Sequence, residues 1–258
     1  MVRLLDKQNE PVEQAFLSDL KRSIEIQESS KRNKEPSHTY KPSGMKCKRA
    51  MVFERVGYPR DEEALSYTLV GICNAGSDIH ERIQKAVCEM KDSGIDCEYA
   101  DVQAYIDSRI CENIGRIDYL EIKGKQGMET KLYDCGLHMS FLCDGIVKYK
   151  SKYYILELKT ETTNKFWSRK GVDPNHYNQA TAYSLALGIP DVLFVYICRD
   201  NLEMKSFLFK VTDEMRTNLQ AMIEDCENHV INGTIPDIPE EASAKFCQYC
   251  GYKQYCGS

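Results

Sequence analysis

Two runs of apolar positions, Phe141–Tyr149 and Tyr153–Lys159, are the strongest pattern in the chain. Only the polar segment 150–152 separates them. Runs of this length around a short polar break predict two antiparallel β-strands joined by a tight turn. We expect the centre of that turn to fall between Lys150 and Ser151.

This pairing brings charged residues to one face of the predicted hairpin. Asp144 lies opposite Glu157, and Lys159 projects from the same face as Glu157 because side chains alternate along a strand. Leu158 then points the other way, into the core. Two opposed carboxylates repel each other, and a divalent cation between them would remove the conflict. A solvated hairpin face with ordinary cross-strand charges remains an equal alternative for so short a pattern.

Magnesium suits such a site because it prefers carboxylate oxygens and retains several water molecules. A bound water of this kind can become a nucleophile. Lys159 would then orient that water or stabilise negative charge developing on a phosphate. The chemistry indicated by the three side chains is therefore hydrolysis of a phosphate ester.

The rest of the chain alternates between helical and strand-like patterns. A break at 74–76 divides the helical pattern of 62–91, and the segment 99–109 fits either a short helix or an extended connection. From residue 62 the expected order is helix, three strands, helix, strand. The predicted strands cover 116–124, 130–150, 152–160, 191–199 and 204–211, and further helices are expected at 12–29, from about 46, and at 175–187 and 212–230.

Length and composition indicate an ordinary globular protein. The 258 residues can form one substantial domain with small attachments, and 42% are apolar and 28% charged. There is no apolar run of about 18 residues and no signal-like segment after Met1, so we expect a cytoplasmic protein without a membrane partner. A net charge of −5 argues against binding nucleic acid over the whole surface, but not against a local basic groove.

Three of the twelve cysteines have the spacing of metal ligands. Cys247, Cys250 and Cys256 form a C-x2-C-x5-C pattern near the end of the sequence, whereas eight others are scattered. Because disulfides are disfavoured in the cytosol, three such thiols indicate a site for a soft metal. A tetrahedral centre requires a fourth ligand from elsewhere in the chain.

The segment 175–187 places Gln179 and Tyr183 one turn apart on a helix. The order Asp144, Glu157-x-Lys159, then Q-x-x-x-Y resembles the RecB-like branch of the PD-(D/E)XK nucleases. The resemblance implies an α/β fold with a restriction-endonuclease-like αβββαβ core and added helices. It also implies that these five residues form the catalytic site, with the Gln and Tyr side chains supporting it and contacting nucleic acid.

Gly76 and His80 match the G-x-x-x-H motif of the same nucleases. Alone, a histidine in the first turn of a helix is more often a surface residue. Because the other motif residues are present, the resemblance implies that His80 binds the metal with Asp144, Glu157 and the Leu158 carbonyl. An imidazole ligand shifts the preference from Mg²⁺ toward Mn²⁺.

The resemblance extends to the iron–sulfur members of that family, the AddB-type helicase-nucleases and the CRISPR-associated adaptation nucleases. In those proteins one cysteine precedes the core and three follow it, which makes Cys47 the fourth ligand. The implied cofactor is a [4Fe–4S] cluster, with Zn²⁺ as the alternative. It would join an N-terminal segment (1–61) to a C-terminal segment (233–258) around a nuclease core (62–232).

The function implied is a metal-dependent deoxyribonuclease, acting as an exonuclease on single-stranded DNA or DNA ends. Its setting would be recombination or repair in a phage or mobile element, or CRISPR adaptation, with homo-oligomers or proteins of those pathways as partners. The sequence contains no Walker-type phosphate-binding loop, so we expect no attached helicase motor. The alternative is a non-catalytic DNA-binding or scaffold protein stabilised by an iron–sulfur or zinc centre.

Overall fold

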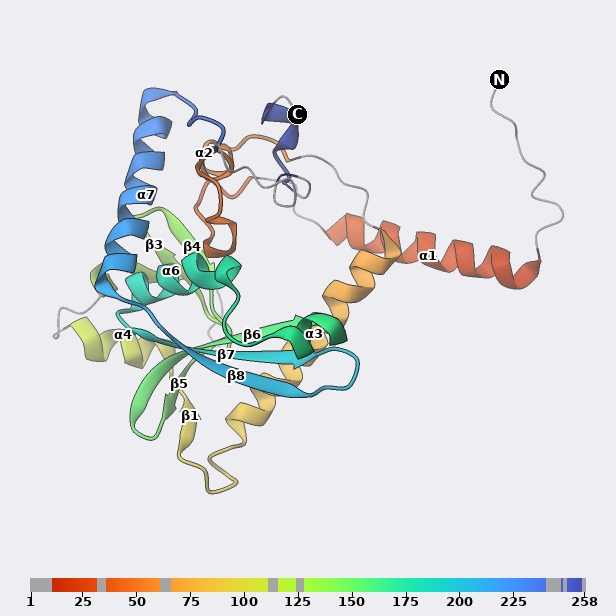
Figure 1. Cartoon of the computed structure of the whole chain (residues 1–258), viewed down its shortest axis with the longest axis horizontal. Coiled ribbons are helices and arrows are strands. Elements are labelled where there is room, and N and C mark those ends of the chain that lie inside the picture. Colours follow the sequence, from red (N-terminus) through yellow and green to blue (C-terminus); the bar gives the residue numbers. More distant parts are fainter. Residues whose placement is uncertain are drawn as a thin grey trace.

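The computed structural model describes residues 11–31, 36–60, 66–110, 116–123, 128–239, 247 and 250–256, which form a mixed α/β fold (Figure 1). Its main sheet has the strand order β1-β5-β6-β7-β8, in which only the β6/β7 pair is parallel. These strands are β1 (Cys97–Tyr99), β5 (Gly145–Tyr149), β6 (Lys152–Glu161), β7 (Asp191–Cys198) and β8 (Met204–Lys210). The helices are α1 (Val12–Lys31), α2 (Lys48–Val56), α3 (Tyr67–Cys88), α4 (Val102–Ile110), α5 (Thr163–Ser168), α6 (Tyr177–Leu187) and α7 (Asp213–Asn232).

The predicted hairpin is the β5/β6 pair, and its register is confirmed, but its first strand starts at Gly145 and not at Phe141. The pairing runs from Gly145 opposite Leu156 to Tyr149 opposite Lys152. The two residues between the strands both have positive φ angles, 49° at Lys150 and 64° at Ser151. A two-residue loop of this conformation matches the twist of the strands, so it holds them in a single register.

Helices cover both faces of the main sheet. Along β6, Ile155 packs with α6 in one core, whereas Leu156 and Leu158 pack with residues of α3 in a second core. Leu158 is fully buried, as the alternation of side chains predicts. Helices α3 and α6, which carry His80 and Gln179, therefore approach β6 from opposite sides.

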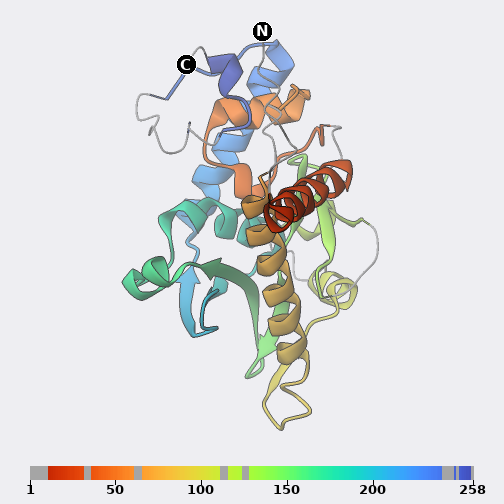
Figure 2. The same cartoon turned by 90° about the vertical axis from the view of Figure 1, so that its right-hand side faces the viewer.

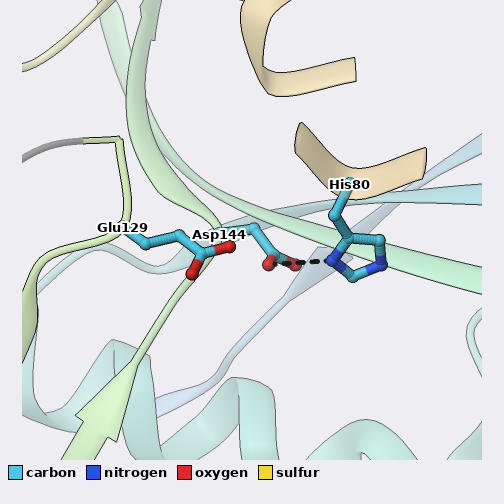
Figure 3. A group of neighbouring side chains, drawn as sticks. All are labelled: His80, Glu129 and Asp144. Carbon is cyan, nitrogen blue, oxygen red and sulfur yellow. Dashed lines mark ion pairs between the residues drawn. The ribbon is translucent and has the colours of Figure 1, made fainter. Parts of the chain in front are cut away.

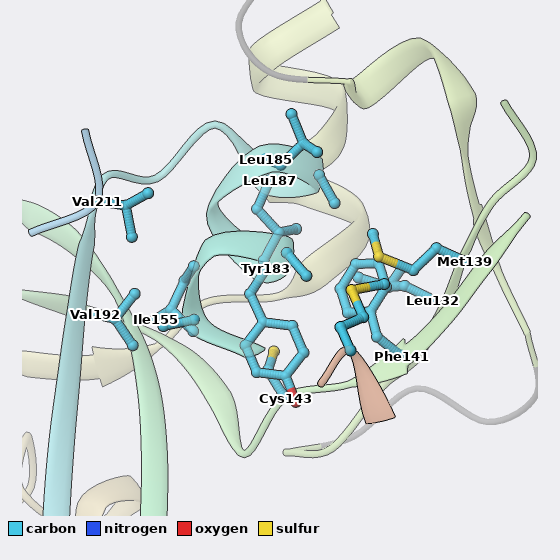
Figure 4. Close-up of a cluster of buried hydrophobic side chains, with 14 of the residues drawn as sticks. Leu132, Met139, Phe141, Cys143, Ile155, Tyr183, Leu185, Leu187, Val192 and Val211 are labelled. Carbon is cyan, nitrogen blue, oxygen red and sulfur yellow. The ribbon is translucent and has the colours of Figure 1, made fainter. Parts of the chain in front are cut away.

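Helix α6 is buried between the main sheet and a smaller one. Every residue from Gln179 to Leu187 is buried. Figure 4 shows Tyr183 of α6 between Ile155 and Val192 of the main sheet and a group of side chains from the smaller sheet. The strands of that smaller sheet, in the order β2-β3-β4, are β2 (Leu120–Ile122), β3 (Lys131–Asp134) and β4 (Met139–Leu142).

The expectation that residues 116–124 supply the first core strand is wrong. They contribute β2, which belongs to the smaller sheet, and the first strand of the main sheet is β1, which shares only Tyr99 with the ambiguous segment 99–109. A strand of three residues is too short to show an alternating pattern, which is why the sequence did not reveal it. The order α3, β1, β5, β6, α6, β7 still follows the expected αβββαβ sequence.

The expected break at 74–76 is also absent, because α3 is one continuous helix. Its N-cap is Ser66, whose hydroxyl accepts a hydrogen bond from the Leu69 backbone N–H, at 3.2 Å. A Cβ atom at Gly76 would lie 3.4 Å from the Thr160 side chain, so glycine allows α3 to pack close to β6. His80 therefore lies in the middle of the helix and not in its first turn.

The C-terminal segment of the described chain meets α2, which starts after Cys47 as expected. The Tyr252 hydroxyl donates to Glu54 at 2.5 Å, and the Arg49 guanidinium donates to the Tyr255 carbonyl at 3.1 Å. Phe53 packs against the rings of both tyrosines. The C-terminal segment is thus attached to α2, the arrangement that a shared metal centre requires.

Helix α1 lies outside this body and crosses the start of α3 (Figure 2). None of its residues is buried. No helix in the described part of the chain is both long and apolar enough to span a membrane.

The turn of the hairpin offers a test of how tightly the register is held. Replacing Lys150-Ser151 by Asn-Gly should stabilise the protein by about 1 kcal/mol, because these residues adopt positive φ angles at lower cost. Urea unfolding measures the change. The matched control Ser151→Ala retains the unfavourable conformation and should bring no gain; a gain in that control would show that the turn is not the source.

Candidate active site

Asp144 directly precedes β5 and is held by the backbone of β6. Its Oδ2 atom accepts a hydrogen bond from the Leu158 N–H at 2.6 Å. Its Oδ1 atom lies 3.3 Å from Nδ1 of His80, which α3 presents (Figure 3). The carboxylate thus has one oxygen toward β6 and the other toward α3.

Glu157 lies on the α6 side of β6 and is almost completely buried, with 3% of its surface exposed. Its Oε1 atom accepts hydrogen bonds from Lys159 Nζ, at 2.5 Å, and from Gln179 Nε2, at 2.7 Å. Its Oε2 atom is buried without a hydrogen-bond partner. Leaving a carboxylate oxygen unpaired in a protein interior is costly, so this atom marks a place where a cation would be favourable.

The environment raises the pKa of Glu157 to about 7. Burial is the main cause because it disfavours the ionised form, and the charge of Asp144 adds to it. Lys159 and His80 act in the opposite direction. The predicted electrostatic conflict between Asp144 and Glu157 is therefore present, and Lys159 relieves only part of it.

Gln179 and Tyr183 complete the network on the α6 side. Gln179 Nε2 donates to the Tyr183 hydroxyl at 2.9 Å, and Gln179 Oε1 accepts from Lys159 at 3.2 Å. The Tyr183 hydroxyl donates to the Leu142 carbonyl at 3.1 Å, and burial raises its pKa well above the ordinary value. Both side chains are buried, so in this structure they position Glu157 and Lys159 and do not form a contact surface.

A third acidic residue, Glu129, lies on the α3 side of Asp144. His80, Glu129 and Asp144 each offer a ligand atom, and these atoms lie within 4.8 Å of one another (Figure 3). This His/Glu/Asp group could hold a metal ion, and Glu157 is not one of its members. Glu129 precedes β3 and has no motif spacing to the other residues, so the sequence offered no signal for it.

Gln84 links the parts of this group. It follows His80 by one helical turn, and its Nε2 atom donates to Glu129 Oε1 at 3.0 Å and to the Asp144 carbonyl at 2.9 Å. Gln84 is buried, with 3% of its surface exposed. It therefore fixes Glu129 relative to the start of β5.

The four cysteines expected to bind a cluster are all half-buried. Burial raises the pKa of Cys250, and the nearby thiols of Cys47, Cys247 and Cys256 raise it further. The cysteines from the two ends of the chain thus lie in one region. Among the described residues, however, their sulfur atoms do not form a group as compact as that of His80, Glu129 and Asp144, so the expected cysteine-ligated cluster is not evident.

No protein-family model and no curated protein matches the sequence. The solved structures to which the chain is similar include two of low sequence identity. One is SSO0001, with 16% identity, a TM-score of 0.46, and 93% of this chain and 96% of that chain covered. The other is an alkaline exonuclease (LHK-Exo) from Laribacter hongkongensis, with 13% identity, a TM-score of 0.44, and 76% of this chain and 92% of that chain covered. At such low identities and TM-scores these similarities do not assign an activity.

The raised pKa of Glu157 predicts how stability depends on pH. The ordinary pKa of a glutamate carboxyl is 4.5, and in the folded protein Glu157 holds its proton up to a pH of about 7. The folded protein therefore loses stability as the pH rises from 4.5 toward about 7. In EDTA, the free energy of unfolding of the wild type should therefore fall more between pH 5 and pH 8 than that of Glu157→Gln. Urea unfolding across this range tests it. Parallel curves for the two proteins would contradict the raised pKa.

Proposed function

We propose that the chain is a metal-dependent nuclease that hydrolyses phosphodiester bonds in DNA. The observation that carries this proposal is the unpaired, buried Oε2 atom of Glu157 close to Asp144. Two carboxylates in such surroundings are stable in the ionised state only with a compensating cation. The donor set of carboxylates with one imidazole suits Mg²⁺ or Mn²⁺.

The residues divide into ligands of the cation, one charged group that acts on the reacting atoms, and supporting side chains. His80, Asp144, Glu157 and the Leu158 carbonyl would hold the cation, which supplies Lewis-acid activation of a phosphoryl oxygen and a lowered pKa of bound water. The Lys159 ammonium would orient the attacking water or stabilise the charge that develops on the phosphate. Gln179 and Tyr183 keep Lys159 and Glu157 in place.

The choice of DNA as substrate comes from the resemblance to RecB-like PD-(D/E)XK nucleases in the order of motifs. On the same ground we propose exonucleolytic action on single strands or ends, in recombination, repair or CRISPR adaptation. The site itself is suited to any phosphodiester that can reach Lys159. A cleavage assay with end-labelled DNA would therefore establish both the substrate and the direction of cleavage.

Replacing either Asp144 or Lys159 should greatly reduce cleavage while the protein remains folded. Asp144→Asn and Lys159→Ala should each lower the rate on labelled DNA with Mn²⁺ by at least about 100-fold. The first loses a carboxylate ligand of the cation, and the second loses the ammonium that stabilises negative charge in the transition state. Lys150→Ala, at the exposed turn of the same hairpin, should cleave at the wild-type rate.

Circular dichroism would confirm that each variant is folded. Full activity in Asp144→Asn or Lys159→Ala would reject the proposed site. A wild-type protein that binds DNA without cutting it, with either Mg²⁺ or Mn²⁺, would favour the non-catalytic scaffold instead.

We propose that Cys47, Cys247, Cys250 and Cys256 hold a [4Fe–4S] cluster, with Zn²⁺ as the alternative. Four thiols are a suitable donor set for either. A centre at this position would strengthen the attachment of the C-terminal segment to α2, to which Tyr252 and Tyr255 already bind. Its role would be structural.

Metal analysis of protein purified without oxygen tests the centre. Cys250→Ser should lose most of the bound iron, or zinc, and lower the melting temperature by several degrees, because a structural metal contributes directly to folding. Cys88→Ser, an exposed cysteine at the end of α3, is the matched control and should retain both. Equal metal content in the two variants would contradict the assignment.

A further inference from the structure

An exposed indole lies close to the proposed site in the fold and has no role in it so far. Trp167, the only tryptophan of the chain, is on α5 and has 58% of its surface exposed. Helix α5 begins two residues after the end of β6, the strand that carries Lys159, and lies at the edge of the molecule in Figure 2. Single exposed apolar residues are common, so the surroundings of the indole decide whether it has a function.

The indole ring is supported by the protein on one side. The buried ring of Phe166 packs against it in a T-shaped arrangement, with the ring centroids 5.3 Å apart. The ammonium of Lys205 lies over the indole, 5.1 Å from a ring centroid. Because the ammonium covers one face and most of the residue is exposed, the other face of the ring is open to a ligand.

The segment that carries the indole is anchored at both ends. At its start, the Thr163 N–H donates a hydrogen bond to Asp200 at 3.0 Å. After its end, the Arg169 guanidinium donates two hydrogen bonds to Glu161, at 2.7 Å and 2.5 Å. The ring is therefore held in place before any ligand arrives, which lowers the entropy lost on binding.

The register of the main sheet places this ring near Lys159. Lys159 pairs with Tyr196 between β6 and β7, and Tyr196 pairs with Lys205 between β7 and β8. Paired residues project from the same face of a sheet, and neighbouring strands are about 4.8 Å apart. The backbone of Lys205 therefore lies about 10 Å from that of Lys159, with both side chains on the α6 side of the sheet.

We propose that Trp167 is a stacking platform for an unpaired base, and that the site therefore takes single-stranded DNA. This inference rests on the proposed function, in which a phosphate of the substrate lies at Lys159. Nucleotides that follow this phosphate along the strand can reach the indole. A base within a duplex has both faces covered by its neighbours, so stacking on the ring selects an unpaired base.

Lys205 adds a positive charge beside the platform. Its ammonium has three N–H donors, and it donates to the carbonyls of Phe166 and Trp167, at 2.8 Å and 3.5 Å. The third N–H can donate to a phosphate of the strand whose base stacks on the ring. An aromatic ring next to a cation is the combination that binds single strands without reading their sequence.

The surroundings of His176 show that positive charge extends between the two lysines of the row. His176 directly precedes α6 and stacks against side chains of β7, the strand between β6 and β8. Burial lowers the pKa of His176 to about 4. The charges of Lys159, Lys165 and Lys46 act in the same direction, and Asp173 acts against them. Ammonium groups in this region attract a phosphate backbone.

Fluorescence tests the inference directly, because Trp167 is the single tryptophan and its emission reports on this place alone. The full-length protein is titrated in EDTA, which prevents cleavage. A single strand of about 12 thymidines should quench the emission, because a base stacks on the indole. A blunt-ended DNA hairpin with the same number of nucleotides should quench it much less.

Variants of the platform should change affinity in a defined order. Trp167→Ala should raise the dissociation constant for a labelled thymidine strand by about 5–100-fold, and Trp167→Phe, which keeps an aromatic face, should raise it less. Leu208→Ala is the matched control, since Leu208 is 57% exposed but projects from the opposite face of β8 to Lys205. It should bind as the wild type does, and circular dichroism checks the fold of each variant.

Two further measurements separate the ring from the charge. Lys205→Met keeps an unbranched side chain at the ring but loses the ammonium, so the slope of the logarithm of the binding constant against that of the salt concentration should decrease by about 0.7. With Mn²⁺, Trp167→Ala should raise KM for single strands and leave kcat nearly unchanged, because the stacking is made equally in the ground state and the transition state.

The outcomes distinguish this inference from the function on which it rests. If the protein cleaves DNA but thymidine strands leave its emission unchanged, or Trp167→Ala binds them as the wild type does, the platform is overturned and the nuclease proposal remains. Stacking without cleavage in Mg²⁺ or Mn²⁺ would reject the nuclease and support the platform. Equal quenching by the hairpin would overturn the selection of single strands. Emission that responds to protein concentration and not to DNA would indicate a contact between chains and overturn the inference.

Discussion

The candidate site depends on the hydrogen bond from the Leu158 N–H to Asp144. The register of β5 and β6 makes this bond possible. The same register places the Asp144 carboxylate beside the buried carboxylate of Glu157. Ionising both in a region of low dielectric constant is unfavourable, so the fold retains an unbalanced negative charge. The surrounding groups, Lys159 on one side and His80 on the other, reduce that charge without cancelling it.

The parts of the site that could be predicted from the sequence are those fixed by local geometry. A two-residue turn and the period of two along a strand were enough to place Asp144 opposite Glu157 and to bury Leu158. The period of an α-helix was enough to bring Gln179 and Tyr183 together. In each case a few neighbouring residues determine the contact.

The features that escaped prediction depend on contacts between distant segments. Glu129 reaches the site because the smaller sheet packs beside α6, which no spacing in the sequence expresses. The strand β1 has three residues and is defined by its partner β5 alone. Gly76 suggests a helix break until the close packing of α3 against Thr160 is known. Tertiary packing overrides local preference at such positions.

The central claim is that a divalent cation binds between Asp144 and Glu157, and a crystal structure with Mn²⁺ tests it most directly. The account predicts an anomalous-scattering peak between these carboxylates, within bonding distance of both and next to the Leu158 carbonyl. A structure at saturating Mn²⁺ with no peak there, and with Glu157 Oε2 paired to another group of the protein, would contradict it.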